Sequence, residues 1–438
     1  MLNTFKKTSP LKIEDILSYY RRGFKKVSDF KIGLEYERLS LNSIDNSPAD
    51  YNDLVKIIEH FSSIKGWGIL KEEGEVIGAL SSSSSISLEP GGQFEISLEP
   101  KEKISEIEEE IKDFSNLLNS ISKSYNIFFL PYGINPKTPY QKIKIIPKKR
   151  YELMNKYFKS CGGAFAPVMM RETAGVQVNL DYKNESDGMK KMRASILISP
   201  ILSGFYSNSV IRNNKKTNYK GFRALSWIYC DKKRCGFFYK NLIEKNEGSF
   251  IDYINSILNV PMIFIEREDK KIEIGGEINF KTFMEKGFKG MYPDINDYIL
   301  HSSLTFPDVR LKNCIEIRNH DSQDIPLTLS IPAFYKGILY NEKSLDEIFN
   351  ILDINYEELN ELLCLSSKNG IDFDFKGQRA SKILKTLFEL SYNNLENDEK
   401  KYLMPALELL EKGECPSDII IENNIQNADE LISFIKRN

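Results

Sequence analysis

The stretch Ile86-Ser-Leu-Glu-Pro-Gly-Gly-Gln-Phe-Glu-Ile-Ser97 carries more information about the fold than any other part of this 438-residue chain. Glu89 and Glu95 lie on either side of a Pro-Gly-Gly turn, and apolar and polar residues alternate after it. Because successive side chains of a strand point to opposite faces, Glu95 faces away from Phe94 and Ile96. The stretch predicts a half-buried strand whose polar face carries carboxylates.

Three further segments show the same alternation and add polar groups to one face. They are 31–38 with Glu35 and Glu37, 176–181 with Gln177, Asn179 and Asp181, and 314–318 with Glu316 and Arg318. An antiparallel sheet with one solvated face gives such alternation without any chemistry. Carboxylates side by side repel one another, however, so a face this rich in glutamate indicates that cations lie among them.

The predicted ligands of divalent cations are five glutamates: Glu35, Glu37, Glu89, Glu95 and Glu316. Mg²⁺ is usually held by one or two carboxylates together with phosphate oxygens, so five carboxylates predict two or three ions. Such ions would hold the triphosphate of ATP, and Arg318 at a strand end would stabilise the transferred phosphoryl group. We therefore expect an ATP-dependent enzyme with Glu95 and Arg318 as catalytic residues.

Composition excludes several other classes of protein. A net charge of −2 gives no electrostatic reason to expect nucleic acid or an anionic membrane as partner. No apolar run approaches the roughly 20 residues of a membrane span, so we expect a cytosolic protein with small-molecule substrates. The six cysteines and three histidines form no zinc motif. Cys230 and Cys235 are close enough in sequence for a redox pair, but reduced thiols are the favoured interpretation.

The order of predicted elements favours an α+β fold with an antiparallel sheet over a doubly wound one. Helices are expected at 13–24, 51–64, 101–125 and 189–205 and repeatedly beyond 326, and strands at 30–41, 128–133, 175–182, 260–267 and 309–318. The serine run 81–85 is expected to be a surface loop. Residues 1–340 would form the catalytic domain, with 341–438 as a helical C-terminal extension packed on it.

These four segments also resemble, in one register, the plant-type glutamate–cysteine ligases of the glutamine synthetase-like superfamily. The matching motifs are Ile-Gly-x-Glu-x-Glu at 32–37, Ile-Ser-Leu-Glu-Pro-Gly-Gly-Gln-Phe-Glu at 86–95, Val-Gln-Val-Asn-Leu-Asp at 176–181 and Glu-x-Arg at 316–318. Lesser matches include Arg150-Tyr151, Trp227 and Thr305-Phe-Pro-Asp-Val-Arg-Leu311. The resemblance runs from about residue 31 to 340, and the helical tail matches more loosely.

The resemblance implies a curved antiparallel sheet whose polar inner face forms a funnel around the metals. It implies that ATP phosphorylates the γ-carboxylate of glutamate and that the amino group of cysteine then displaces phosphate, in the first step of glutathione synthesis. Gln177 and Asn179 would lie near the metals or the nucleotide. Arg223 and Arg234 would hold substrate carboxylates or phosphate, and Mg²⁺ or Mn²⁺ would serve as the metal.

Departures from the plant pattern leave the acceptor amine open. Tyr36 and Arg38 replace a histidine and a lysine, and 319–323 reads Asn-His-Asp-Ser-Gln where the plant enzymes have small residues. A sister ligase that passes activated glutamate to another amine is therefore the alternative function. A catalytically silent nucleotide-binding relative is a third hypothesis, which the intact glutamate and arginine set disfavours. The oligomeric state, redox or feedback regulation and the identity of the general base stay open.

Overall fold

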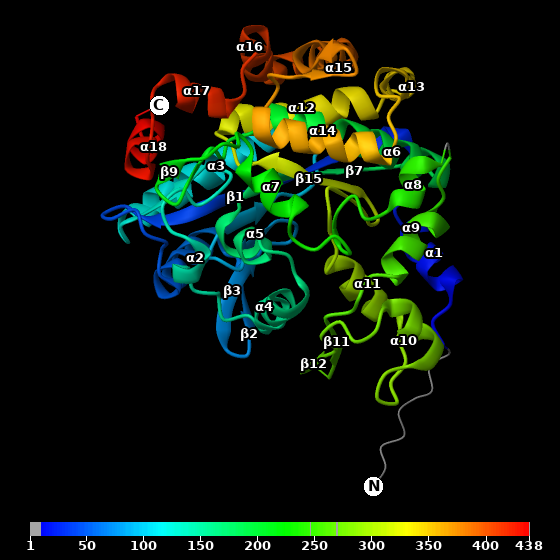
Figure 1. Cartoon of the computed structure of the whole chain (residues 1–438). Helices are drawn as coiled ribbons and strands as arrows, with labels where there is room; N and C mark the ends of the chain where they lie inside the picture. Colours follow the sequence, from blue (N-terminus) through cyan, green and yellow to red (C-terminus); the bar gives the residue numbers. More distant parts are fainter. Residues whose placement is uncertain (1–9, 246, 269, 438) are drawn as a thin grey trace.

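The computed structural model describes residues 10–245, 247–268 and 270–437, and a large antiparallel sheet lies at its centre (Figure 1). Eight strands follow the order β14-β15-β7-β1-β5-β4-β3-β2, and a ninth, β6, pairs with β1. The strands are β1 (Ile32–Asn42), β2 (Gly68–Glu72), β3 (Glu75–Leu80), β4 (Ser85–Leu88), β5 (Phe94–Ser97), β6 (Ile127–Leu130), β7 (Gly175–Leu180), β14 (Val309–Leu311) and β15 (Ile315–Asp321).

Strand β1 lies between the segments that the sequence singled out. It pairs with β5 on one side and β7 on the other, which places Glu37 opposite Glu95 and Glu35 opposite Gln177. Leu34 lies on the other face and is fully buried. The period of two along each strand therefore collects the predicted polar groups on one face of the sheet.

Helices cover the apolar face of the sheet, and others flank its opposite face. The helices are α1 (Ile13–Arg21), α2 (Tyr51–Lys65), α3 (Ile104–Lys123), α4 (Lys149–Cys161), α5 (Ala166–Glu172), α6 (Glu185–Phe205), α7 (Phe222–Ile228), α8 (Lys240–Glu244), α9 (Phe250–Leu258), α10 (Phe280–Lys286), α11 (Ile295–Ser303), α12 (Ile325–Leu339), α13 (Glu342–Ile351), α14 (Tyr356–Asn369), α15 (Ala380–Asn394), α16 (Met404–Lys412), α17 (Pro416–Glu422) and α18 (Ala428–Ile435). Helix α3 carries a buried stripe of Ile104, Ile107, Ile111 and Phe114, as an amphipathic helix on a core does. Helices α6 and α12 contact the sheet, and α13 to α16 pack outside them (Figure 1).

The opposite face of the sheet is flanked by two groups of elements. Figure 1 shows α4, α5 and the β2–β3 hairpin on one side, and α10, α11 and a second hairpin on the other. The small pairs outside the main sheet are β8 (Ile211–Arg212) with β9 (Lys215–Lys216), β10 (Cys235–Gly236) with β13 (Phe306–Pro307), β11 (Phe264–Arg267) with β12 (Lys270–Glu273), and β16 (Asp374–Phe375) with β17 (Gln378–Arg379).

One buried carboxylate joins the C-terminal helices to the rest of the fold. Glu399, which is 1% exposed, accepts from the backbone N–H of Ile104 at 2.9 Å, at the start of α3. Its two oxygens also accept from Lys336 Nζ at 2.8 and 2.7 Å. The predicted boundary between 340 and 341 falls between α12 and α13, and the division into two parts stays a prediction.

The structure confirms the α+β fold and corrects two predicted strands. Residues 309–318 form the hairpin β14–β15 instead of one strand, because the chain reverses where Lys312 N–H donates to Cys314 O at 2.8 Å. The strand predicted at 260–267 begins only at Phe264 and pairs with β12 outside the main sheet. Residues 81–84 of the serine run connect β3 and β4 as a loop, as predicted, although Ser84 is buried and Ser85 already belongs to β4. Within the described residues no helix has the length and apolarity to cross a membrane.

Candidate active site

The polar face of the sheet forms the floor of a cleft with a volume of about 380 Å³. Seven predicted residues of the sheet and its β4–β5 turn line this cleft together: Glu35, Glu37, Glu89, Glu95, Gln177, Glu316 and Arg318. They come from β1, the β4–β5 turn, β5, β7 and β15. Segments that are far apart in the sequence therefore meet at one place, as the alternation predicts.

The turn between β4 and β5 is closed by its own backbone. Glu89 O accepts from Gly92 N–H at 2.8 Å, and Gly92 has a positive φ of 82°, which favours glycine. A Cβ atom on Gly91 would lie 2.2 Å from the backbone oxygen of Arg171. Gln93 accepts from Gly91 N–H at 2.7 Å and donates to Thr173 O at 2.7 Å. The Gly-Gly pair and Gln93 thus fix the position of Glu89 and Glu95.

The glutamates of the cleft repel one another. The hydroxyl of Ser87 lies 3.2 Å from both Glu89 Oε1 and Glu95 Oε1, so the two carboxylates share one donor. Burial, and then the charge of Glu89, raise the pKa of Glu37 to about 7. Burial and the neighbouring charges, of which Glu89 is the largest, also raise the pKa of Glu95 well above its ordinary value. A bound cation would relieve this repulsion.

The donor chemistry of this group fits a hard divalent cation, because Mg²⁺ prefers carboxylate oxygens. Glu35, Glu37, Glu89 and Glu95 supply those oxygens, and their mutual repulsion is the property that a cation would offset. Among the described residues, no three His, Cys, Asp or Glu side chains are already gathered around one point. Their role as metal ligands therefore stays a prediction that the donor set supports.

Glu316, the fifth predicted ligand, has a different environment. Its side chain is fully buried and accepts from Arg310 Nε at 2.6 Å, from Lys312 Nζ and from Arg318 Nη1 at 3.0 Å. Although burial raises the pKa of Glu316, these three cations outweigh that effect and hold it well below its ordinary value. In this structure Glu316 is thus neutralised by side chains, and its contact with a metal stays a prediction.

The amides of β7 orient the charged groups around them. Gln177 accepts from Arg318 Nη1 and donates from Nε2 to Glu37 Oε1 at 3.1 Å. Asn179 Nδ2 donates to Glu35 Oε1 at 2.9 Å. Gln177 therefore links the predicted catalytic arginine to a predicted metal ligand, and Asn179 orients a second ligand.

The two other predicted arginines have different placements. Arg223 lines the cleft and is 4% exposed, and its Nη2 donates to Arg318 O at 3.0 Å. Arg234 is fully buried and does not line the cleft. Its Nε donates to Asp231 at 3.0 Å, and Nη1 and Nη2 donate to the carbonyl oxygens of Leu304 and Pro261. The structure thus corrects the expected placement of Arg234, because those partners hold its guanidinium inside the protein.

One side of the cleft is a basic wall that was not predicted from the sequence. This wall consists of Lys148, Arg150, Arg310 and Lys312. Arg150 donates to Ser303 Oγ at 3.1 Å and to Ser303 O at 2.9 Å, which holds the start of α4 against the end of α11. The family matches at Arg150-Tyr151 and at 305–311 were the available signals for Arg150 and Arg310. No sequence signal placed Arg310 opposite Glu316, since their pairing depends on the unexpected hairpin.

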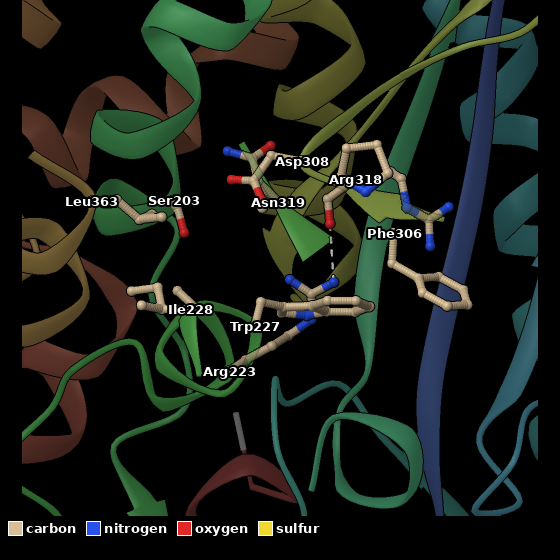
Figure 2. Close-up of a pocket in the computed structure, with 12 residues that line it drawn as sticks. Ser203, Arg223, Trp227, Ile228, Phe306, Asp308, Arg318, Asn319 and Leu363 are labelled. Carbon is tan, nitrogen blue, oxygen red and sulfur yellow. Dashed lines mark hydrogen bonds between the residues drawn. The ribbon is translucent and has the colours of Figure 1, made fainter. Parts of the chain in front are cut away.

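Most departures from the plant pattern lie outside the cleft. Tyr36 is 2% exposed and donates to Gln323 O at 2.7 Å, on the apolar side of β1. Arg38 lies on the same side, with its guanidinium carbon 5.8 Å from the ring centre of Phe114. His320 is fully buried. Of these departures, Asn319 borders a small pocket beside the cleft (Figure 2).

Comparisons with known proteins show which family the chain belongs to. The sequence profile described as "Glutamate-cysteine ligase family 2" matches residues 31–436, so the match includes the helical tail. The chain is 30% identical to the chloroplastic glutamate–cysteine ligase of Nicotiana tabacum over 94% of this chain and 80% of that protein. It is 31% identical to the chloroplastic glutamate–cysteine ligase B of Oryza sativa subsp. japonica over 98% and 84%.

A solved structure has the same fold. The glutamate–cysteine ligase of Francisella tularensis, determined in complex with AMP, superposes with a TM-score of 0.61 at 11% identity. The match covers 94% of this chain and 87% of that one. With the profile match over nearly the whole chain and the plant relatives at about 30% identity, the protein belongs to glutamate–cysteine ligase family 2.

Proposed function

We propose that this protein joins the γ-carboxylate of glutamate to the amino group of cysteine in an ATP-dependent reaction. The observation that carries the proposal is the convergence of four glutamates, Gln177 and Arg318 in one cleft of a family member. The choice of glutamate and cysteine as substrates follows from the names of the relatives. Their names also place them in chloroplasts, so the cytosolic location expected from the sequence stays a prediction.

The acidic floor of the cleft would hold the metal ions, and the basic wall would receive phosphate oxygens. Bound Mg²⁺ would neutralise the triphosphate of ATP and polarise the phosphoryl group that is transferred. Glu35, Glu37, Glu89 and Glu95 are the groups that would hold it, with Asn179 and Ser87 orienting their carboxylates. The number of ions, two or three, follows from the number of carboxylates and is part of the proposal.

Arg318 is the group that would face the transferred phosphoryl. Its guanidinium is held between Gln177 and Glu316, so it reaches the cleft already oriented and needs little reorganisation during the reaction. The γ-carboxylate of glutamate attacks the terminal phosphorus of ATP and forms γ-glutamyl phosphate and ADP. The neutral amino nitrogen of cysteine then attacks the γ-carbonyl carbon, a C–N bond forms, phosphate leaves with the C–O bond electrons, and the nitrogen releases a proton.

The test is phosphate release from ATP and Mg²⁺ by the purified protein, first with glutamate alone and then with cysteine, 2-aminobutyrate or other amines. Strong stimulation by cysteine, with γ-glutamylcysteine detected by mass, is the expected result. Stimulation by a different amine would support the sister ligase. No turnover with any pair of substrates would refute the proposed activity.

A pair of variants tests the site itself. Glu95→Gln removes a charge from the cleft floor, whereas Glu411→Gln makes the same change at an exposed position on α16. We expect the first variant to lose at least 100-fold in kcat and the second to keep the activity of the unmodified protein. Equal activity of the two variants would show that the glutamate cluster is not needed for the reaction.

A further inference from the structure

A small side pocket opens beside the cleft, between α7, β13 and β15 (Figure 2). It has a volume of about 20 Å³, and it shares Arg223, Trp227, Phe306 and Arg318 with the cleft. Asp308 and Asn319 line the side pocket and do not line the cleft. The pocket is thus a recess of the active site with its own polar groups.

Three buried polar atoms around this recess have no hydrogen-bond partner. They are the donors Arg223 Nε and Trp227 Nε1 and the acceptor Asn319 Oδ1. Arg223 is 4% exposed and Asn319 is 6% exposed, so water at the protein surface does not satisfy them. Unpaired buried polar atoms are costly, and here they occur together at one recess.

Asp308 brings a negative charge to the same recess. Its Oδ2 accepts from Ser199 Oγ at 3.0 Å, and its backbone oxygen accepts from Arg318 N–H at 2.9 Å, which fixes the residue against α6 and β15. Figure 2 shows Asp308 and Asn319 across the recess from Arg223 and Trp227. One side therefore offers acceptors and negative charge, and the other offers donors and positive charge.

The head group of an α-amino acid is a ligand whose two charged groups match the two sides of the recess. An ammonium group suits Asp308 and Asn319, and a carboxylate suits Arg223 and the indole N–H of Trp227. A volume of about 20 Å³ holds roughly one water-sized group, which matches an ammonium and not a whole side chain. The carboxylate would then stay at the mouth, where Arg223 and Trp227 border both spaces.

The chemistry of the reaction decides which amino acid this is. The acceptor must present a neutral amino nitrogen to the γ-carbonyl carbon, so a site that holds its nitrogen as ammonium would oppose the second step. The donor keeps its α-amino group out of the reaction. We propose that Asp308 and Asn319 bind the α-ammonium group of the donor glutamate, an inference that rests on the proposed function.

This placement has a chemical consequence. In γ-glutamyl phosphate, a free α-amine attacks its own γ-carbonyl carbon: a C–N bond forms, the C–O bond to phosphate breaks, phosphate leaves, and nitrogen gives a proton to water. The product is 5-oxoproline. A protonated nitrogen held beside Asp308 has no lone pair for this attack. The recess thus keeps the activated donor available for the acceptor amine.

The first test compares glutamate with glutarate, which has the same γ-carboxylate but no α-ammonium. We expect the unmodified protein to prefer glutamate by at least tenfold in kcat/KM. Asp308→Asn should reduce that preference by about 10- to 100-fold, the usual loss for a hydrogen bond between charged groups, while the KM for ATP changes little. Asp321→Asn is the matched control, because Asp321 faces Arg223 at 3.9 Å but lines neither pocket. An equal loss of preference in both variants would overturn the assignment.

The second test follows the products. Asp308→Asn should raise the ratio of 5-oxoproline to γ-glutamyl product at limiting acceptor, and Asn319→Ala should raise it to a smaller extent. Calorimetric binding of glutamate and glutarate to the unmodified protein keeps the inference testable if a variant fails to fold or if no turnover is found. Equal affinity for the two ligands would overturn it, whereas absent turnover with selective glutamate binding would refute only the proposed reaction.

Discussion

Replacement of Glu37 by glutamine should stabilise the metal-free protein, and the gain should grow with pH. The pKa of this carboxyl is raised from 4.5 to about 7 in the folded protein by burial and the charge of Glu89. A raised pKa means that the folded state binds the proton more tightly than the unfolded state. The resulting stabilisation is complete below pH 4.5 and is lost as the pH rises through about 7.

The magnitude follows from the two pKa values. A change in pKa from 4.5 to about 7 corresponds to a difference of about 3 kcal/mol in the free energy of unfolding, at about 1.4 kcal/mol for each pKa unit. Glutamine carries no charge at any pH and does not incur this loss. The Glu37→Gln variant should therefore gain about 3 kcal/mol over the unmodified protein between pH 4.5 and pH 8, apart from a constant offset for the lost second acceptor oxygen.

Urea unfolding in EDTA at several values from pH 4.5 to 8 measures this difference, with Glu411→Gln as the exposed control. A difference that stays constant with pH would refute the electrostatic account of the cleft. Saturating Mg²⁺ should reverse the order, because a cation that binds only the folded state stabilises the protein that retains all four carboxylates.

Three further predictions concern other parts of the site. Arg318→Ala should lower kcat by at least 100-fold, since it removes the group that we propose faces the phosphoryl, and single-turnover release of phosphate measures the loss; a change in KM alone would contradict this role. Arg310→Met should lower the free energy of unfolding by about 3–5 kcal/mol in thermal or urea unfolding, because it removes two hydrogen bonds from a fully buried Glu316, and a loss below about 1 kcal/mol would mean that Lys312 and Arg318 suffice. Tyr36→His should leave the preference among acceptor amines unchanged in a substrate panel, because Tyr36 lies on the apolar side of β1, and an altered preference would show that the two faces of the sheet are coupled.

The polar floor of the cleft was predictable from the sequence because strand alternation is local. Once Glu35, Glu37 and Glu95 are assigned to strands, their faces follow from the period of two. The pairing of strands was not predictable, and so neither was the position of Glu37 opposite Glu95. Register depends on contacts between distant segments, which a single sequence does not reveal.

The predictions that were wrong also depended on contacts between distant segments. The reversal at 312–314 lacks the Asn-Gly or Gly-Gly signature of a tight hairpin, so 309–318 looked like one strand. Arg223 and Arg234 both lie within the stretch that resembles the family, yet only Arg223 reaches the cleft, since the partners of Arg234 include Leu304 and Pro261. Whether an arginine lines a cleft or holds backbone carbonyls is decided by tertiary packing, not by its neighbours in the chain.

The strand order of the sheet has a consequence for folding during synthesis. Gln177 is 140 residues from its partner Glu37, and Arg318 is 141 residues beyond Gln177. Tyr340 then donates back to Lys31 O across 309 residues. Proteins dominated by such long-range pairs fold slowly, because loop closure must precede the contacts that reward it. A nascent chain shorter than about 320 residues cannot complete the sheet: β1 has all its partners once β7 is made, but the other edge of β7 stays unpaired until β15 is translated. We therefore expect the exposed edge of β7 to be the part of the sheet that most needs a chaperone during translation.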